Sequence, residues 1–333
     1  MSETGSEPLR VGALGAARIT PTALIRPTRE NPEVVVTAVA ARDPRRGREY
    51  ARRHGVAKVH DSYEALLADP DVDAVYNPLP NGLHGRWTLA ALAAGKHVLC
   101  EKPFTANAEE AREVAGAAVA SGLVVMEAFH YRYHPLALRM EEILDSGELG
   151  TLRHVETAVC FPLPSFSDIR YDYGLAGGAM MDAGCYAVHM ARLFGGREPE
   201  VVSARAKLRG PRIDRAMTAR LRFPGGHTGV VRASLWSSSL ARISVRVVGS
   251  RGILSALNPM APQYWHRLTV RVAGGKRVER FARRPTYAYQ LDAFAASVRR
   301  GAPVLTPPED AVATMSVIDA AYLAAGLPLR VPS

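Results

Sequence analysis

Three side chains in this sequence have the types and spacing of an acid–base centre. Lys102 follows the apolar segment His97–Cys100 and precedes Pro103, so we expect its ammonium group at the end of a strand. Asp182 and Tyr186 are four residues apart and would share one face of a helix. A nearby ammonium stabilises a phenolate and lowers the pKa of a tyrosine from its ordinary value of about 10. Lys102 and Tyr186 therefore form a candidate acid–base pair, and Asp182 would orient the lysine or substrate hydroxyls.

A glycine-rich turn follows the first apolar segment, Leu9–Leu14. Such a turn lets backbone N–H groups and a helix N-terminus approach a pyrophosphate. The G-x-G-x-x-G fingerprint is incomplete, because Ala17 and Thr20 stand where it has glycine, and small residues that only allow packing are the alternative. Its place at the start of an alternating strand–helix pattern favours a dinucleotide. The expected contacts are Gly12, Gly15, Ala16, Ala17, Arg18 and Ile19.

The end of the second strand predicts which dinucleotide is bound. An acidic residue there binds the ribose 2′-hydroxyl of NAD, whereas a small residue followed by arginine accommodates the 2′-phosphate of NADP. Ala41 and Arg42 stand at this point, with Arg45 or Arg46 behind them, and favour NADP(H) over NAD(H). Asp43 is the counter-argument, since a shift of one residue would bring its carboxylate to the ribose.

The amino-acid composition limits which classes of partner this protein is expected to bind. Of 333 residues, 47% are hydrophobic and 22% charged, which is enough apolar side chain for a sizeable core. The net charge is +10, but 37 of the 42 basic residues are arginines scattered along the chain, so we expect no nucleic acid. An anionic small molecule is the expected partner of the dense run 42–53. Three separate cysteines and no apolar run of membrane-spanning length predict a cytoplasmic protein without disulfides, metal or membrane contact.

Two kinds of element pattern divide the chain. Up to about residue 126, short apolar strands alternate with helices, as in a doubly wound parallel sheet. The expected strands are Leu9–Leu14, Val34–Ala41, Ala74–Tyr76, His97–Cys100 and Leu123–Met126, and the expected helices are 17–26, 44–54, 63–68, 84–94 and 107–121. Beyond Phe129, long segments of period two predict a large, mostly antiparallel sheet, followed by helices near 287–300 and 308–324. The strands expected in this sheet are 151–160, 201–209, 216–223, 228–236, 242–248 and 267–273.

The predicted organisation is an α/β Rossmann domain over residues 8–128 and an α+β domain over 129–330. In the second sheet, segments such as 204–209 and 220–223 alternate apolar with basic residues, so one face packs on helices and the other stays open. Large exposed sheet surfaces are usually covered by another chain. We therefore expect a homodimer or homotetramer through this sheet.

Three motifs together resemble the Gfo/Idh/MocA family of NAD(P)-dependent sugar oxidoreductases. They are Asn77-Pro78-Leu79-Pro80-Asn81-Gly82-Leu83-His84, Glu101-Lys102-Pro103 with its preceding strand, and Asp182-Ala183-Gly184-Cys185-Tyr186-Ala187-Val188-His189. Tyrosine at 186 is similar to the branch that contains glucose–fructose oxidoreductase, dimeric dihydrodiol dehydrogenase, D-xylose dehydrogenase and sugar 3-ketoreductases. The resemblance implies hydride transfer between NADP(H) and a hydroxyl or carbonyl carbon of a carbohydrate-like substrate.

The resemblance also implies further contacts. The residues expected around the cofactor are Leu79, Pro80, Asn81, His84, Glu101, Lys102 and Arg132, and those expected near the substrate are Arg170 and His189. His84 as a helix cap, Arg132 as a surface arginine and His189 as a hydrogen-bonded helix histidine are the alternatives. Two other functions stay open, which are a glycosidase that uses a tightly held NAD and a non-catalytic dinucleotide sensor.

Overall fold

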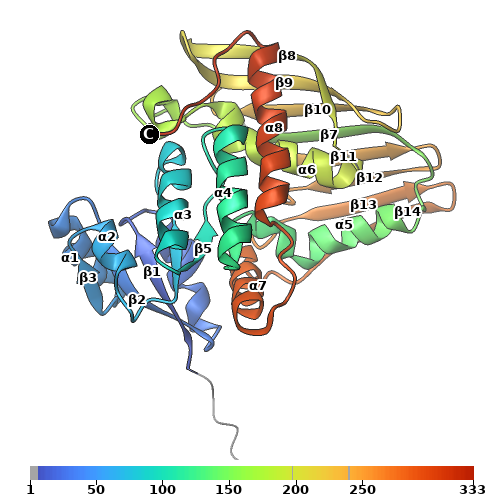
Figure 1. Ribbon diagram of the computed structural model, residues 1–333. Coiled ribbons are helices and arrows are strands. Elements are labelled where there is room, and N and C mark those ends of the chain that lie inside the picture. Colours follow the sequence, from blue (N-terminus) through green and yellow to red (C-terminus); the bar gives the residue numbers. More distant parts are fainter. Residues whose placement is uncertain (1–6, 197, 239–240) are drawn as a thin grey trace, which may run out of the picture.

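The first half of the chain builds a six-stranded parallel sheet in the order β3-β2-β1-β4-β5-β6 (Figure 1). The computed structural model describes residues 7–196, 198–238 and 241–333. The strands are β1 (Leu9–Leu14), β2 (Val34–Ala40), β3 (Lys58–His60), β4 (Ala74–Asn77), β5 (His97–Cys100) and β6 (Val125–Glu127). The strand order reverses between β1 and β4, and ligands of such sheets bind at this point, beyond the carboxyl ends of the strands.

Helices α1 (Pro44–His54), α2 (Tyr63–Leu67), α3 (His84–Ala93) and α4 (Ala108–Ser121) connect these strands. The helix expected over 17–26 is not formed. A π-helical turn, Pro21–Ile25, and a 3₁₀ turn, Pro27–Arg29, take its place. The two prolines explain the difference, because a proline lacks the N–H that an uninterrupted helix needs and is tolerated only in a first turn.

The second half builds an eight-stranded sheet in the order β14-β13-β12-β11-β7-β10-β9-β8. Its strands are β7 (Leu152–Cys160), β8 (Glu200–Gly210), β9 (Ile213–Arg222), β10 (Thr228–Ser234), β11 (Arg242–Gly249), β12 (Gly252–Leu257), β13 (Arg267–Val272) and β14 (Gly275–Glu279). Neighbouring strands are antiparallel except β7 and β10, which are parallel. The predicted fold class, a Rossmann-type parallel sheet and a mostly antiparallel sheet, is confirmed.

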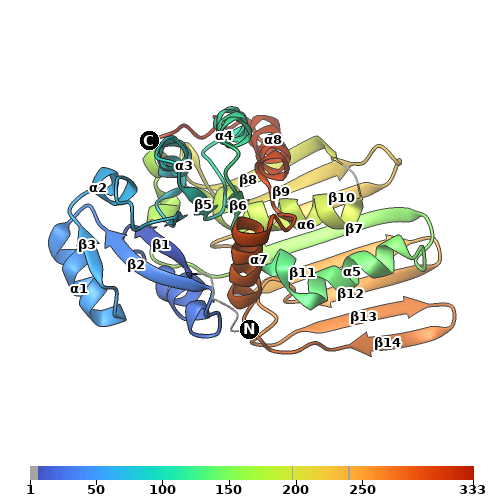
Figure 2. The same ribbon diagram turned by 60° about the horizontal axis from the view of Figure 1, so that its bottom comes forward.

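Helices α5 (Pro135–Asp145), α6 (Cys185–Gly195) and α8 (Pro308–Ala324) cover one face of the second sheet (Figures 1 and 2). Basic side chains of β8, β9 and β11 are exposed, among them Arg205, Arg220 and Arg246. Helix α7 (Thr286–Arg300) instead returns to the first sheet, where Leu291 and Phe294 share a core with Leu9. None of the helices in the described part of the chain is both long and apolar enough to span a bilayer.

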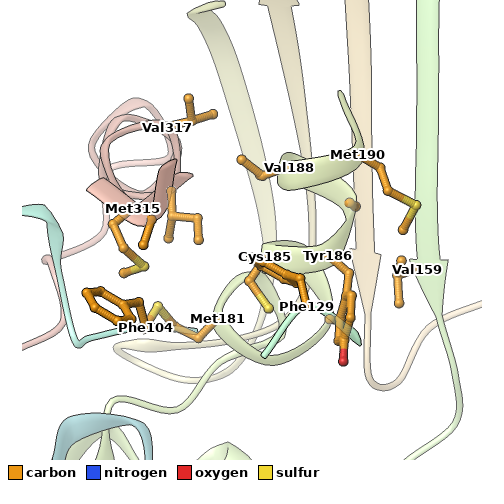
Figure 3. Packing of buried hydrophobic residues seen from close by; sticks show 14 of the residues in the cluster. Phe104, Phe129, Val159, Met181, Cys185, Tyr186, Val188, Met190, Met315 and Val317 are labelled. Carbon is orange, nitrogen blue, oxygen red and sulfur yellow. The ribbon is translucent and has the colours of Figure 1, made fainter. Parts of the chain in front are cut away.

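A single large core joins the two halves. It extends from Leu14 of β1 through Phe104 and Met315 to Val231 of the second sheet. Figure 3 shows Tyr186 of α6 beside Phe129 in this core, and its hydroxyl is directed away from the labelled apolar side chains. The start of α6 is therefore held by packing from both halves, which gives its polar side chains a defined position.

Candidate active site

The segment after β5 and the segment before α6 bring two charged groups into contact. The Lys102 Nζ lies 3.3 Å from Asp182 Oδ1, and both side chains are nearly buried, with exposed fractions of 14% and 8%. Arg170 donates from Nε to the other carboxylate oxygen of Asp182 at 3.0 Å. A single carboxylate is thus held between two cations.

The charges in this cluster outweigh burial. Burial alone would raise the pKa of the Asp182 carboxyl, but Lys102 and Arg170 hold that pKa below its ordinary value. Burial also opposes the charge on Lys102, yet Asp182 raises the pKa of the ammonium group. Both groups are therefore ionised at neutral pH, and the site holds a fixed ammonium with little access to water.

Tyr186 lies beside this ammonium, but the ammonium does not decide its protonation. The Lys102 Nζ is 5.1 Å from the centroid of the Tyr186 ring, so it faces the ring. Burial, followed by Tyr287 and Glu101, raises the pKa of Tyr186 well above 10. The expectation that Lys102 lowers this pKa is wrong for the structure, because desolvation of the phenolate is the larger effect. Tyr186 carries its proton at neutral pH.

The Tyr186 hydroxyl has a hydrogen-bond partner that the sequence did not identify. His130 Nε2 lies 3.0 Å from the Tyr186 Oη, and His130 Nδ1 lies 2.7 Å from the Thr286 Oγ1. Burial, and then Lys102, lower the pKa of His130 to about 3, so its imidazole is neutral. His130 closely follows β6, and the rule that ligands gather at the carboxyl ends of parallel strands is the sequence signal that could have identified it.

Two expected contact residues are engaged elsewhere. The Arg132 guanidinium forms two hydrogen bonds with Glu141, at 2.5 and 2.8 Å. His189 contacts the Tyr131 hydroxyl with Nδ1 at 2.5 Å and Asp310 with Nε2 at 2.9 Å. Both ring nitrogens of His189 are occupied and buried, so the structure favours the alternative of a hydrogen-bonded helix histidine.

The glycine turn after β1 is tight and partly open to solvent. Gly15 has φ of +91°, a conformation that favours glycine, and its N–H donates to Ala40 O at 2.6 Å. Gly12 serves packing, since a Cβ there would lie 2.8 Å from Leu66 Cδ2. Residues 16, 17 and 19 are partly exposed and Arg18 is exposed, so the turn is accessible from solvent. These residues fit a bound pyrophosphate.

The end of β2 presents cations and not a carboxylate. Ala41 is buried, and Arg42 and Arg46 are exposed. The Asp43 carboxylate caps α1 by accepting a hydrogen bond from the Arg45 N–H at 2.9 Å. A side chain used as a helix cap is oriented toward its own helix, which leaves the arginines as the groups at this edge.

The other residues expected around the cofactor also lie at the carboxyl edge of the parallel sheet. Asn81 Nδ2 donates to Ala176 O at 3.1 Å, and Glu101 accepts from the Tyr76 hydroxyl at 2.8 Å. His84 is buried between two loops, with its ring nitrogens 2.7 Å from Pro103 O and 2.6 Å from Leu79 O. His84 thus ties the loop of Leu79 and Pro80 to the loop of Lys102.

An open cavity of about 400 Å³ lies between the loop 166–173 and the β8–β9 turn. Asp168 lines it and pairs with Arg170 at 3.1 Å, and Arg170 in turn pairs with Asp182. Two consecutive ion pairs, Asp168–Arg170 and Arg170–Asp182, therefore connect the cavity wall to the Lys102–Asp182–Tyr186 cluster. Among the described residues, no three His, Cys, Asp or Glu side chains are grouped as metal ligands.

Comparison with known proteins agrees with this architecture. Residues 9–129 match the model of an oxidoreductase family with an NAD-binding Rossmann fold, and residues 137–255 match the GFO/IDH/MocA C-terminal domain. A D-xylose 1-dehydrogenase (NADP⁺) of Haloferax volcanii is 38% identical over 93% of this chain and 95% of its own length. A trans-1,2-dihydrobenzene-1,2-diol dehydrogenase of Oryctolagus cuniculus is 40% identical over 67% of this chain and 68% of its own length.

Solved structures extend the similarity to the whole fold. A 3-ketoreductase from Actinomadura kijaniata, in complex with NADP and TDP-benzene, superposes with a TM-score of 0.88 at 30% identity. The match covers 96% of this chain and 98% of that one. Variants of that reductase with a lysine or a tyrosine replaced have also been solved. With both halves matched and relatives aligned over nearly its full length, the chain belongs to the Gfo/Idh/MocA family of NAD(P)-binding oxidoreductases.

Proposed function

We propose that this protein is an NADP(H)-dependent oxidoreductase that interconverts a carbinol and a carbonyl on a sugar or sugar-like substrate. The observation that supports this proposal most directly is the buried Lys102–Asp182–Tyr186 cluster at the carboxyl edge of the parallel sheet. Relatives named for D-xylose, for an aromatic dihydrodiol and for a dTDP-linked keto sugar all act on carbon that bears an oxygen. Two of these three names refer to sugars, which favours a sugar or sugar-like substrate.

Residues of this chain supply the proton and polarise the substrate oxygen. Bound nicotinamide would supply or accept the hydride. In reduction, the Tyr186 hydroxyl gives its proton to the substrate oxygen while Lys102 donates a hydrogen bond to that oxygen. Asp182, whose other carboxylate oxygen is paired with Arg170, holds the ammonium in place. In oxidation, Tyr186 must first lose its proton, and because its pKa is raised, the oxidation rate increases with pH.

The cofactor-binding roles follow the edge of the first sheet. We assign the pyrophosphate to the turn of Gly15–Ile19, and the nicotinamide end to Leu79, Pro80, Asn81 and Glu101. We assign the 2′-phosphate of NADP to Arg42 and Arg46, because the Asp43 carboxylate caps α1 and is not directed at the ribose. Arg170 and the cavity beside Asp168 would contact the rest of the substrate.

Replacing Arg42 with alanine is expected to weaken NADPH binding roughly 10- to 100-fold, which is the value of a hydrogen bond to a charged group. NADH binding should change less than about 3-fold, since NADH lacks the 2′-phosphate. Fluorescence titration with both nucleotides measures this. Arg53→Ala is the matched control, because Arg53 lies at the other end of α1 and pairs with Glu49. Equal losses for NADPH and NADH would contradict the assignment.

The function itself is tested by titration with NADPH and NADH, followed by absorbance assays with NADP⁺ and a panel of aldoses, inositols and dihydrodiols. Stoichiometric reduction of NADP⁺ by any member supports the proposal. The relatives reported above are named dehydrogenases or reductases, so the glycosidase and the non-catalytic sensor are not favoured. Product release without net NADP⁺ reduction would indicate the glycosidase, and binding without turnover would indicate the sensor.

The face of the second sheet that carries Arg205, Arg220 and Arg246 is proposed as the interface of a homodimer or homotetramer. An eight-stranded sheet leaves a wide surface there, and such surfaces are usually covered. Light scattering at micromolar concentration should give a mass of at least two chains. A mass of one chain would contradict this expectation.

A further inference from the structure

His130 is a buried histidine whose ring bridges two uncharged hydroxyl groups, one on α6 and one on α7. One nitrogen contacts the Tyr186 hydroxyl and the other the Thr286 hydroxyl, at 3.0 and 2.7 Å. The ring also lies against Tyr287, with centroids 4.1 Å apart. The side chain is 4% exposed, so water does not compete for either nitrogen.

A neutral imidazole has one N–H and one acceptor nitrogen, and the partner of the far nitrogen decides which is which. A carbonyl opposite Nδ1 would keep the proton there. Thr286 offers a hydroxyl, which both donates and accepts, so Nδ1 keeps its hydrogen bond in either tautomer. His130 Nε2 is therefore able to accept from the Tyr186 hydroxyl or to donate to the Tyr186 oxygen without becoming charged.

This freedom matters for a tyrosine that must give up a proton. When the Tyr186 proton moves to a substrate oxygen, the phenolate left behind is buried and needs a hydrogen-bond donor. The Lys102 ammonium faces the ring, and in the described residues the group at hydrogen-bond distance from the Tyr186 Oη is His130 Nε2. Nε2–H is thus the donor placed to stabilise the phenolate.

We infer that His130 is a positioning residue for Tyr186, which aims the hydroxyl and donates to its oxygen as the proton leaves. The inference rests on the proposed role of Tyr186 as the proton donor. His130 does not touch the substrate or the hydride, and its effect on the rate passes through the Tyr186 oxygen. The proton that moves is that of Tyr186, and His130 ends each step neutral.

The first test is His130→Met, which fills the same space without a polar atom. We expect kcat to fall roughly 10- to 100-fold, the value of a hydrogen bond to a charged group, with KM and NADPH affinity within about 2-fold. The pH at which the oxidation rate reaches half its maximum should rise, because the phenolate has lost its donor. His130→Gln, whose amide donates and accepts, should restore most of the rate and of the pH profile.

Several other titratable groups face Tyr186 and need to be held constant in this comparison. They are Lys102 and Glu101 after β5, Asp182 and Cys185 before and at the start of α6, Tyr287 of α7 and Tyr76 of β4. None of them is changed by the His130 substitutions. A shift of the pH profile in His130→Met that His130→Gln reverses is therefore assigned to Tyr186.

The decisive measurement is a double-mutant cycle. In the Tyr186→Phe background, His130→Met should reduce the remaining activity less than about 2-fold, because its target hydroxyl is already gone. Equal losses in both backgrounds, or an unchanged pH profile, would overturn the inference. His134→Met is the control, since His134 is buried and hydrogen-bonded but contacts α5 and Ala282 O. If Tyr186→Phe itself keeps normal turnover, the proposed function fails instead.

Discussion

Replacing Lys102 with methionine, or Tyr186 with phenylalanine, is expected to lower kcat by at least about 100-fold while NADPH binding persists. General acid–base groups contribute roughly 10²–10⁴-fold to a rate. Methionine fills the space of the lysine stem, and Arg170, which lies 3.0 Å from Asp182, leaves the carboxylate with one cation, so we expect the loop to keep its shape. Phenylalanine keeps the ring contacts of Tyr186 with Phe129 and removes the hydroxyl. Steady-state turnover and NADPH titration of each variant measure the effect.

Two matched controls separate chemistry from packing. The Lys96 ammonium donates hydrogen bonds to the backbone oxygens of Asp69 and Val72, and Lys96 is not part of the Lys102–Asp182–Tyr186 cluster. Tyr133 is a buried tyrosine whose hydroxyl contacts Thr306. Lys96→Met and Tyr133→Phe should therefore keep kcat within about 3-fold, since Lys96 loses two hydrogen bonds and Tyr133 one, and none of these involves the Lys102–Asp182–Tyr186 cluster. Near-normal turnover in both Lys102→Met and Tyr186→Phe would refute the assignment of the active site.

Replacing Arg330 with methionine is expected to lower the free energy of unfolding by about 3–5 kcal/mol, the cost of leaving a buried charge unpaired. Arg330 and Asp214 are both 0% exposed and form an ion pair at 2.9 Å. Arg330 Nε also donates to Gly177 O at 2.6 Å. Asp214 accepts from the Met180 N–H at 2.7 Å, at the start of the segment that leads to Asp182 and Tyr186. The pair therefore stabilises both the second domain and the entry to the active-site helix.

Urea unfolding followed by circular dichroism measures this loss. Burial raises the pKa of Asp214 even with Arg330 present, and without Arg330 that pKa rises further. A carboxyl whose folded pKa is raised is favoured in its protonated form, so the loss should be smaller at acidic than at neutral pH. Arg300→Met is the control, because Arg300 is exposed and solvent screens its ion pair with Glu33, so its loss should cost little stability. A loss no larger than that of the control would contradict the prediction.

Local pattern determined most of the fold. Strands β1 and β5 and helix α8 occupy the expected ranges. A buried parallel strand is a short continuous apolar run, and α8 begins with Pro308 followed by two acidic residues in its first turn, so these signals are local. The strands that were missed are β3, β12 and β14. β3 has only three residues and β14 five, and both contain charged residues. β12 and β14 begin with glycine, so the strand conformation of all three depends on pairing with a neighbour.

The sequence by itself identified the candidate catalytic residues, because strand ends and helical spacing are local properties. Lys102 at the end of a parallel strand and Asp182 four residues before Tyr186 follow from the chain alone, and the structure brings the three together. The sequence also indicated Ala41 and Arg42 at the end of the second strand. These positions depend on the order of residues along one or two neighbouring elements.

Only the tertiary structure decided the partners and the protonation states. His130, Thr286 and the Arg330–Asp214 pair come together from segments far apart in the chain. Arg132 forms hydrogen bonds with Glu141, and His189 with Asp310, and no sequence motif indicated either contact. The pKa of Tyr186 depends on desolvation by every element packed around it, and this outweighs the one nearby ammonium that the motif suggested. Burial is a sum over the whole fold, and a linear sequence does not display it.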